Sequence, residues 1–230
     1  FPSKKSQPYK KLPPIEFFTI PLKSLTRDCL HMIFSAKERS VSADILFNVI
    51  SKCKPEETIY DILFKLFYSV RKKEILEGVE DNFSFPSNAA NEQNLAIILR
   101  QMSPFQDCPL LAPSKNKHNL DLDKVLNDKK NYHVILRCFM KDELVNDLVT
   151  YWFLDYLINI PKAKLKHPVV LIIDELLPIS DNPILSSKLR QLLYICRGKG
   201  INIVSTAQSV ANLDLQLARS FSDYVFGRIS

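Results

Sequence analysis

Apolar residues in the first half of the chain recur at the spacing of amphipathic helices. Between about Leu22 and Met102, they repeat at intervals of three and four residues in each of four stretches. These stretches are SLTRDCLHMIF, SADILFNVI, TIYDILFKLFYSVRKKEIL and NEQNLAIILRQM. A short strand (residues 15–20, IEFFTI) precedes them, and residues 78–90 read as a loop before the last one. The pattern therefore predicts a largely helical first half.

The second half follows a different pattern, in which apolar strands alternate with helices. A Pro-rich loop over residues 103–119 opens it, and LDLDKVL then reads as a short edge strand or a turn leading into one helical turn. The predicted strands are YHVILRC (132–138), PVVLIID (168–174), INIVSTAQ (201–208) and YVFGRIS (224–230). The predicted helices between them are DELVNDLVTYWFLDYLIN, PILSSKLRQLLYICR and DLQLARSFS.

The strands are apolar throughout and do not alternate with polar residues, which indicates a parallel sheet with helices on both faces. Asn182 and Pro183 suit the first positions of the helix over residues 183–197, and Gly198 and Gly200 mark its end. The fold class we expect is α/β, with a parallel sheet core and a helical insertion in the N-terminal half. The predicted division is a basic tail (1–14), a strand plus helical insertion (15–103) and the core (104–230).

Composition places the chain among ordinary globular proteins. Of its 230 residues, 46% are hydrophobic and 24% charged. None of its apolar runs reaches the roughly 18–20 residues that span a bilayer, so we expect no membrane span. The five cysteines are scattered without metal-ligand spacing, which favours reduced thiols and a cytoplasmic location.

The net charge of +6 is concentrated in two places. Four lysines lie in the first eleven residues, and three more occupy one short connection (Lys162, Lys164 and Lys166). A nucleic-acid partner is compatible with this distribution, and solvated lysines explain it equally well.

The candidate chemistry lies where two predicted strands end. Asp174 and Glu175 end PVVLII, and Gln208 ends INIVSTA. If these strands are neighbours, the three side chains meet at one edge of the sheet, where open α/β sheets bind ligands. Phosphoryl transfer requires such groups: Asp174 to hold Mg²⁺ through water, Glu175 to activate the attacking water and Gln208 to sense the γ-phosphate.

A guanidinium would complete this set by stabilising the transferred phosphoryl group. Arg197 is the candidate, two turns beyond Arg190 on the same helix, and Arg228 is the reserve. Each residue also has a simpler interpretation. A buried strand that reaches water ends in acids, Gln208 is a polar strand terminus, and Arg197 complements a helix C-terminus.

Residues 169–230 resemble the C-terminal half of the HerA/FtsK superfamily of pumping ATPases, closest to HerA-like and conjugative type IV secretion ATPases. The matching elements are the acid pair (Asp174–Glu175, the Walker B position), Arg197-Gly198-Lys199-Gly200, Thr206-Ala207-Gln208 and the stretch 224–228. The resemblance implies a RecA-like core, ATP and Mg²⁺ as cofactors, and a homohexamer that moves DNA or protein–DNA substrates through its pore, with Arg197 acting across the subunit interface. Other transfer or packaging proteins are further implied partners.

The chain also departs from the family pattern. It reads TAQ where the family usually has TQ, and it has no GxxxxGK[ST] phosphate-binding loop among its four glycines. We expect that loop to precede Phe1 in a longer protein or to have been lost, and we expect the 230 residues to be catalytically inert by themselves. The alternative function is a RecA-like binding or assembly module without catalysis.

Overall fold

The computed structural model describes residues 18–34, 39–71, 92–106, 110–128, 143–209 and 211–225. Its α-helices are α1 (Arg27–Ile33), α2 (Arg39–Lys52), α3 (Ile59–Arg71), α4 (Glu92–Gln106), α5 (Leu122–Asn127), α6 (Glu143–Asn159), α7 (Leu177–Asp181), α8 (Pro183–Lys199) and α9 (Leu215–Ala218). Its 3-10 turns are η1 (Leu22–Ser24) and η3 (Lys162–Lys164), and its strands are β1 (Ile20–Pro21), β2 (Leu111–Ala112), β3 (Val169–Ile173) and β4 (Ile201–Ser205). None of the described helices is long and apolar enough to cross a membrane.

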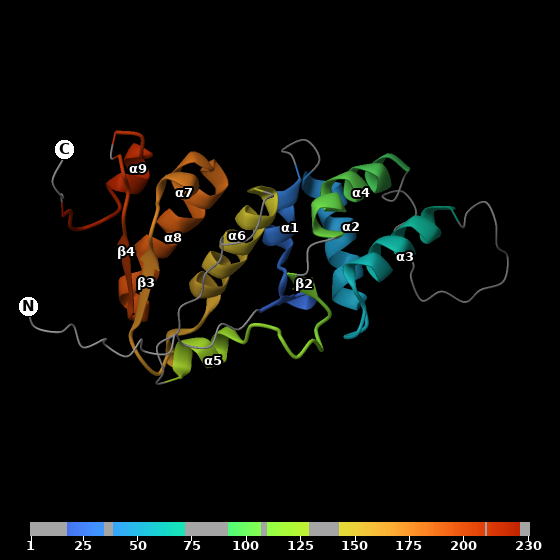
Figure 1. Ribbon diagram of the computed structural model, residues 1–230, viewed down its shortest axis with the longest axis horizontal. Helices are drawn as coiled ribbons and strands as arrows, with labels where there is room; N and C mark the ends of the chain where they lie inside the picture. The colour runs from blue at the N-terminus through green and yellow to red at the C-terminus, as the bar shows by residue number, and fades with distance from the viewer. Residues whose placement is uncertain are drawn as a thin grey trace, which may run out of the picture.

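The elements form a row of layers (Figure 1). The pair β3–β4 lies at one end, and α8 packs between β4 and α6. Helix α6 packs in turn against α1, and α1 packs against α2. Helices α3 and α4 pack against each other at the far end. The helical first half and the α/β second half thus meet along α6.

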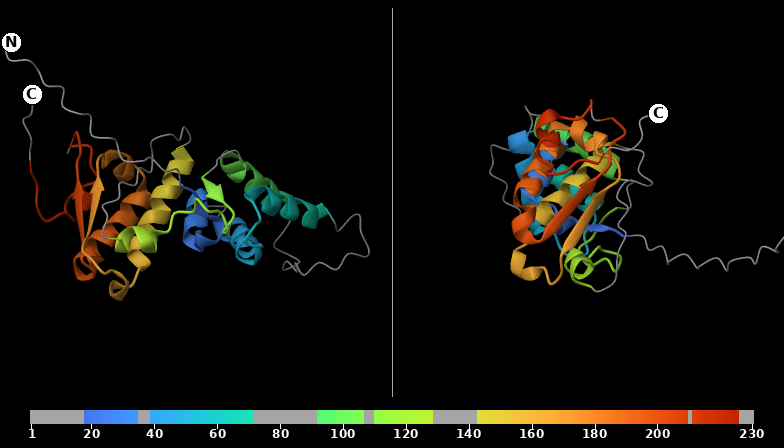
Figure 2. Two further views of the ribbon diagram at one scale, coloured as in Figure 1. Left: turned by 60° about the horizontal axis from the view of Figure 1, so that its bottom comes forward. Right: turned by 90° about the vertical axis from the view of Figure 1, so that its left-hand side faces the viewer.

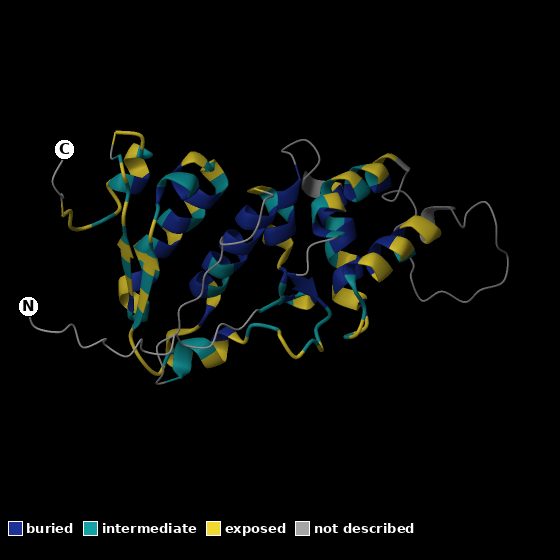
Figure 3. Ribbon diagram, viewed as in Figure 1, coloured by how far each residue is buried: buried dark blue, intermediate teal, exposed yellow. Residues whose placement is uncertain are grey.

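Helix α6 is buried along both of its sides (Figure 3). Its sequence is apolar around most of its circumference, as expected of a helix that contacts layers on two sides. Trp152 is 4% exposed, and its indole Nε1 donates a hydrogen bond to Ser24 Oγ over 3.0 Å. Helix α6 is therefore buried on more than one side.

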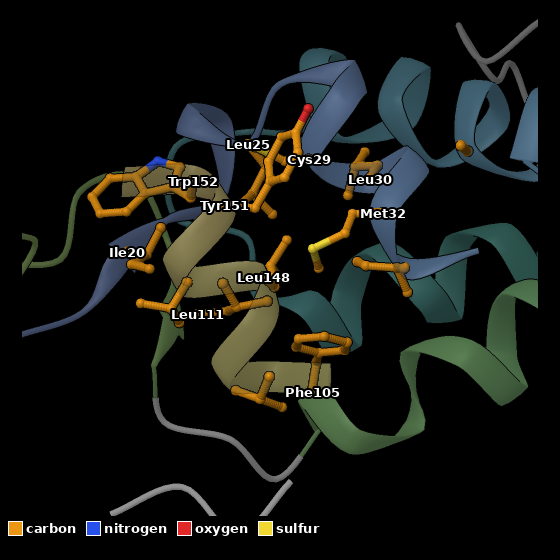
Figure 4. Close-up of a cluster of buried hydrophobic side chains, with 14 of the residues drawn as sticks. Ile20, Leu25, Cys29, Leu30, Met32, Phe105, Leu111, Leu148, Tyr151 and Trp152 are labelled. Carbon is orange, nitrogen blue, oxygen red and sulfur yellow. The ribbon is translucent and has the colours of Figure 1, made fainter. Parts of the chain in front are cut away.

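The helical half has a well-packed apolar core (Figure 4). Ile20, Leu30 and Phe105 reach it from three different segments, and Leu148 meets them from α6. Fully burying one such side chain stabilises a fold by roughly 1.5–3 kcal/mol. The four predicted helices of the first half are confirmed as α1, α2, α3 and α4.

The predicted loop over residues 103–119 is wrong at its start. Helix α4 continues to Gln106 through Pro104, which cannot bond the carbonyl four residues earlier. The hydroxyl of Ser103 donates to that carbonyl, Arg100 O, over 2.9 Å, so the group keeps a partner. The helical alternative for LDLDKVL is confirmed as α5.

A small parallel sheet joins the start of the described chain to the same loop region. Ile20 pairs with Leu111 in β1–β2, and Thr19 bridges Asn119. Of the predicted strand over residues 15–20, Ile20 lies in β1 and Thr19 in the bridge, whereas residues 15–17 lie outside the described part. The sequence reading did not predict β2.

The second sheet is the parallel pair β3–β4, in register from Val169 opposite Ile201 to Ile173 opposite Ser205. Alternate side chains of both strands pack into or against the apolar core, whereas Val170, Ile172 and Val204 are 59%, 68% and 53% exposed. An α/β fold with parallel strands is confirmed, but the prediction of helices on both faces is wrong for the described residues. In the right-hand view of Figure 2, β3 and β4 lie in front of the helices.

Two predicted strands lie wholly or mostly outside the described residues. Residues 132–138 lie outside the described residues, as do residues 226–230. Tyr224 and Val225 are described and have no strand pairing, so the predicted last strand is wrong over these two residues. The division into a tail, a helical insertion and a core stays a prediction.

Candidate functional site

Helix α8 carries the chain back so that β3 and β4 run parallel. Asn182 Oδ1 accepts hydrogen bonds from the amides of Ile184 and Leu185, which starts α8, and Pro183 occupies its first position. Gly200 ends it with φ 78° and ψ 26°, a left-handed conformation that favours glycine. These predicted signals are confirmed, and they set the start of β4 beside the start of β3.

The carboxyl ends of both strands therefore lie at one edge, here called the rim (Asp174, Glu175, Thr206 and Gln208). Thr206 N donates to Ile173 O over 3.0 Å, and Leu176 N donates to Thr206 O over 2.9 Å. The Thr206 hydroxyl also donates to Asp174 O. The rim thus follows from the parallel pairing of β3 and β4, which the sequence reading had required.

The side chains at the rim differ in their exposure to solvent and in their hydrogen bonding. Asp174 and Gln208 are exposed, whereas Glu175 is half-buried. Glu175 Oε1 accepts a hydrogen bond of 3.2 Å from Leu177 N, in the first turn of α7. A role for Glu175 in activating water requires this carboxylate to leave that amide or to share it.

Arg197, the first candidate arginine, does not join the rim of its own chain. Arg197 lies near the end of α8, and a helix of 17 residues is about 25 Å long. Because α8 starts beside the rim and ends beside the start of β4, Arg197 lies at the opposite end of the sheet, where it is exposed. Arg190 bonds Gln216 of α9, and Arg228 lies outside the described residues.

A shallow hollow of about 510 Å³ lies next to the rim, between the start of α6 and the α7–α8 turn. It is lined by Glu143, Asp147, Pro178, Asp181, Asn182, Pro183 and Ile184. Asn182 Nδ2 donates to Asp147 Oδ2 over 2.8 Å, so the residue that starts α8 also ties it to α6. Within the described ranges, no group of His, Cys, Asp and Glu is arranged to hold a metal ion.

Mg²⁺ bound with a nucleotide needs little from the protein, because one or two carboxylates and the phosphates suffice. The exposed Asp174 at a strand end fits that requirement. The phosphates need a cradle of backbone amides, and the GxxxxGK[ST] loop that provides it is not present in the sequence. The rim therefore fits the metal side of a nucleotide site and does not by itself fit the phosphate side.

The sequence reading missed one buried polar cluster, at the junction of α1, α6 and α8. Lys188 Nζ lies 2.6 Å from Asp155 Oδ1, and the Thr26 hydroxyl donates to Asp155 Oδ2 over 3.1 Å. One signal could have found it: Asp155 interrupts the most apolar helix of the chain, and a buried carboxylate needs a cation or several donors. The identity of the cation depends on how α6 and α8 pack.

This chain matches no protein-family model, no curated protein and no solved structure. Its resemblance to the HerA/FtsK superfamily therefore stays a prediction. That prediction rests on the motifs between Asp174 and Gln208, and the geometry of the rim is the structural observation that bears on it.

Proposed function

We propose that this chain supplies the acidic rim of an ATP-driven translocase of the HerA/FtsK type. The observation that carries the proposal is the position of Asp174, Glu175 and Gln208, which follow the carboxyl ends of two neighbouring parallel strands. Ligands of open α/β sheets bind at this edge. An acid pair and an amide there match what phosphoryl transfer needs beside a metal-bound triphosphate.

Each rim residue has a defined part in this proposal. Asp174, exposed at the end of β3, holds Mg²⁺ through water. Glu175 leaves the amide of Leu177 to orient and polarise the attacking water. Gln208 reads the γ-phosphate or that water, and the link from Thr206 to Asp174 O couples the two strand ends.

The rest of the site comes from outside these residues. A phosphate-binding loop is needed from another segment or another chain. The exposed Arg197 is too far from its own rim to serve it, a position that suits action on the rim of a neighbour in a homohexamer. DNA as the translocated substrate, transfer or packaging proteins as further partners and a cytoplasmic location belong to the same proposal.

A second candidate is a binding or assembly module that keeps the scaffold without catalysis. Two observations favour it: Glu175 is bonded to the amide of Leu177, and the apolar side chains of Val170 and Ile172 are exposed on the sheet. A parallel sheet is normally covered on both faces, so this surface suits a stable partner.

The substitution Glu175→Gln in the full-length protein tests the motor. We expect it to abolish DNA-stimulated ATP turnover while nucleotide remains bound, because the amide cannot take up a proton from water. The matched control is Glu56→Gln, which changes an exposed carboxylate on the helical half and should leave turnover unchanged.

Two outcomes would count against the motor. Full turnover in the Glu175→Gln variant would remove Glu175 from the mechanism. A full-length protein that neither binds nor hydrolyses ATP would favour the assembly module instead.

A further inference from the structure

A basic hollow lies at the end of the sheet opposite the rim, where α6 leads into β3. It has a volume of about 610 Å³. Its lining consists of Lys162, Ala163, Leu165, Lys166, His167, Pro168, Lys199 and Gly200, here called the lysine hollow. Three lysines and a histidine contribute to this lining, and none of the described residues that form it is acidic.

The loop that carries two of these lysines is held in shape by the fold. Its 3-10 turn is closed by hydrogen bonds from Lys164 N to Pro161 O and from Leu165 N to Lys162 O, of 2.9 and 3.0 Å. Lys166 N donates to Asn127 Oδ1 of α5 over 2.8 Å. Leu165 packs against the apolar core, so the lysines on either side of it are left exposed. A loop anchored in this way loses little conformational freedom when it binds a ligand.

Lys199 adds a fixed positive charge to the hollow. Its ammonium donates to Ile160 O over 2.6 Å and also to Ile158 O, at the end of α6. Both acceptors are neutral carbonyls, so neither of these hydrogen bonds cancels its charge. Burial lowers the pKa of Lys199. Asp123 of α5 accepts a hydrogen bond of 2.6 Å from the Tyr156 hydroxyl and does not line the hollow.

We propose that the lysine hollow binds the phosphate backbone of DNA. The inference rests on the proposed function for its choice of DNA among polyanions. The geometry favours a nucleic acid over an anionic membrane: the surface is concave, and Leu165, its one large aliphatic side chain, is partly buried against the core. Membrane-binding segments instead present large apolar side chains to the lipid.

This position also separates the proposed DNA contact from the proposed nucleotide site. The rim lies at the carboxyl ends of β3 and β4, and the lysine hollow lies where β3 begins. DNA and ATP would therefore occupy opposite ends of the same two strands without competing. Helix α8, which runs between these ends, would link them.

The test is DNA binding by the full-length protein without ATP, measured by fluorescence anisotropy of a labelled 30-base-pair duplex between 50 and 200 mM salt. The variant is Lys162→Ala/Lys166→Ala, which leaves Lys199 in place as the cap of α6. The control is Lys52→Ala/Lys117→Ala, which removes the same charge from two exposed lysines that do not line the hollow. The lysines of residues 1–14 are present in the wild type and in all the variants, so their contribution to DNA affinity cancels in the comparison.

Because each phosphate contact adds about 0.9 to the slope of log K against log salt, losing two contacts should lower the slope by about two. Affinity should fall by roughly tenfold or more, while the control keeps both the slope and the affinity of the wild type. Lys162→Arg/Lys166→Arg, which keeps the charge, should bind as the wild type does. Unfolding midpoints of all variants check that they are folded.

Four results would overturn the proposal: no DNA binding by the wild type, equal slopes for the variant and the wild type, equal loss in variant and control, or a loss seen on vesicles of anionic lipid and not on DNA. The motor proposal fails separately. If the protein binds DNA through the hollow but has no ATP turnover, the proposal for the hollow stands and the motor proposal fails. If Lys162→Ala/Lys166→Ala leaves DNA-stimulated ATP turnover unchanged, the motor proposal stands and the proposal for the hollow fails.

Discussion

The ion pair between Lys188 and Asp155 gives the sharpest prediction about the fold. The side chains are 10% and 5% exposed, and the ammonium lies 2.6 Å from Asp155 Oδ1. Asp155 also accepts a hydrogen bond from Thr26 at the start of α1 and one of 3.0 Å from Asn159. One buried carboxylate thus joins α8, α6 and α1, the three layers where the two halves of the chain meet. The Lys188 ammonium lies 4.8 Å from the centre of the Tyr151 ring.

Removing either partner leaves a buried charge that has lost its counter-charge, which costs about 3–5 kcal/mol. We expect the cost of Asp155→Ala to lie at the upper end of this range, because the ammonium is left with the Tyr151 ring and the Thr26 hydroxyl keeps only the weaker sulfur acceptor of Cys29. The cost of Lys188→Met should lie nearer the lower end of this range, because Thr26 and Asn159 still donate hydrogen bonds to the carboxylate. The double variant Asp155→Leu/Lys188→Met replaces the pair by apolar groups of similar size and should lie within about 1 kcal/mol of the wild type.

The assay is urea unfolding followed by the fluorescence of Trp152, the one tryptophan of the chain, which is buried in α6. Lys65→Met, which breaks the more exposed pair with Glu57, is the control and should cost at most about 1 kcal/mol. Burial lowers the pKa of Lys188, but the hydrogen bond and charge of Asp155 outweigh it and leave that pKa raised. The pair's contribution is therefore present below pH 10.5 and lost as the pH rises through the folded-state pKa. Single variants that each cost less than 1 kcal/mol and simply add would refute the reasoning.

Two further predictions concern backbone and thiol. Gly200→Ala should lower the free energy of unfolding by about 1 kcal/mol, because φ of Gly200 is 78°. Gly198→Ala should raise it by about 0.5–1 kcal/mol, because Gly198 is helical and its Cβ position is open. Calorimetric midpoints that move in the same direction for both variants would contradict this pair of predictions. Burial raises the pKa of Cys29 from 9.0 to about 11. The neutral thiol's contribution to the free energy of unfolding is therefore present below pH 9 and is lost as the pH rises through 11. The stability difference between wild type and Cys29→Ala should then shrink by up to about 2.7 kcal/mol over that range in urea titrations, and a constant difference would show that the thiol ionises normally.

The parts of the fold that the sequence predicts are those with local signals. Both boundaries of helix α8 have local signals: the side chain of Asn182 starts it, and Gly200, which has no Cβ, ends it in a left-handed conformation. Helix α6 is apolar on most sides, which predicts contact with two layers. The rim followed from a general rule about parallel strands, applied to Asp174 and Gln208 without knowledge of their distance.

The parts that escaped prediction depend on tertiary contacts. A strand of two residues such as Leu111–Ala112 has no alternation to recognise. Pro104 suggests a helix end, yet the Ser103 hydroxyl satisfies the carbonyl that the proline leaves free. The partner of Asp155 was not predictable because it depends on which turn of α8 packs against α6.

The uncovered face of β3–β4 bears directly on how the rim could work. Val170, Ile172 and Val204 are more than half exposed on a parallel pair, a class of sheet that is normally covered on both faces. An element packed on this face would bury these side chains, and fully burying each is worth roughly 1.5–3 kcal/mol. It would also convert the exposed rim into a crevice, in which the electrostatic interactions of the carboxylates are stronger because water is excluded. The motor proposal therefore requires a covering element as well as a phosphate-binding loop, and a single segment that provides both would satisfy the open sheet and the incomplete rim together.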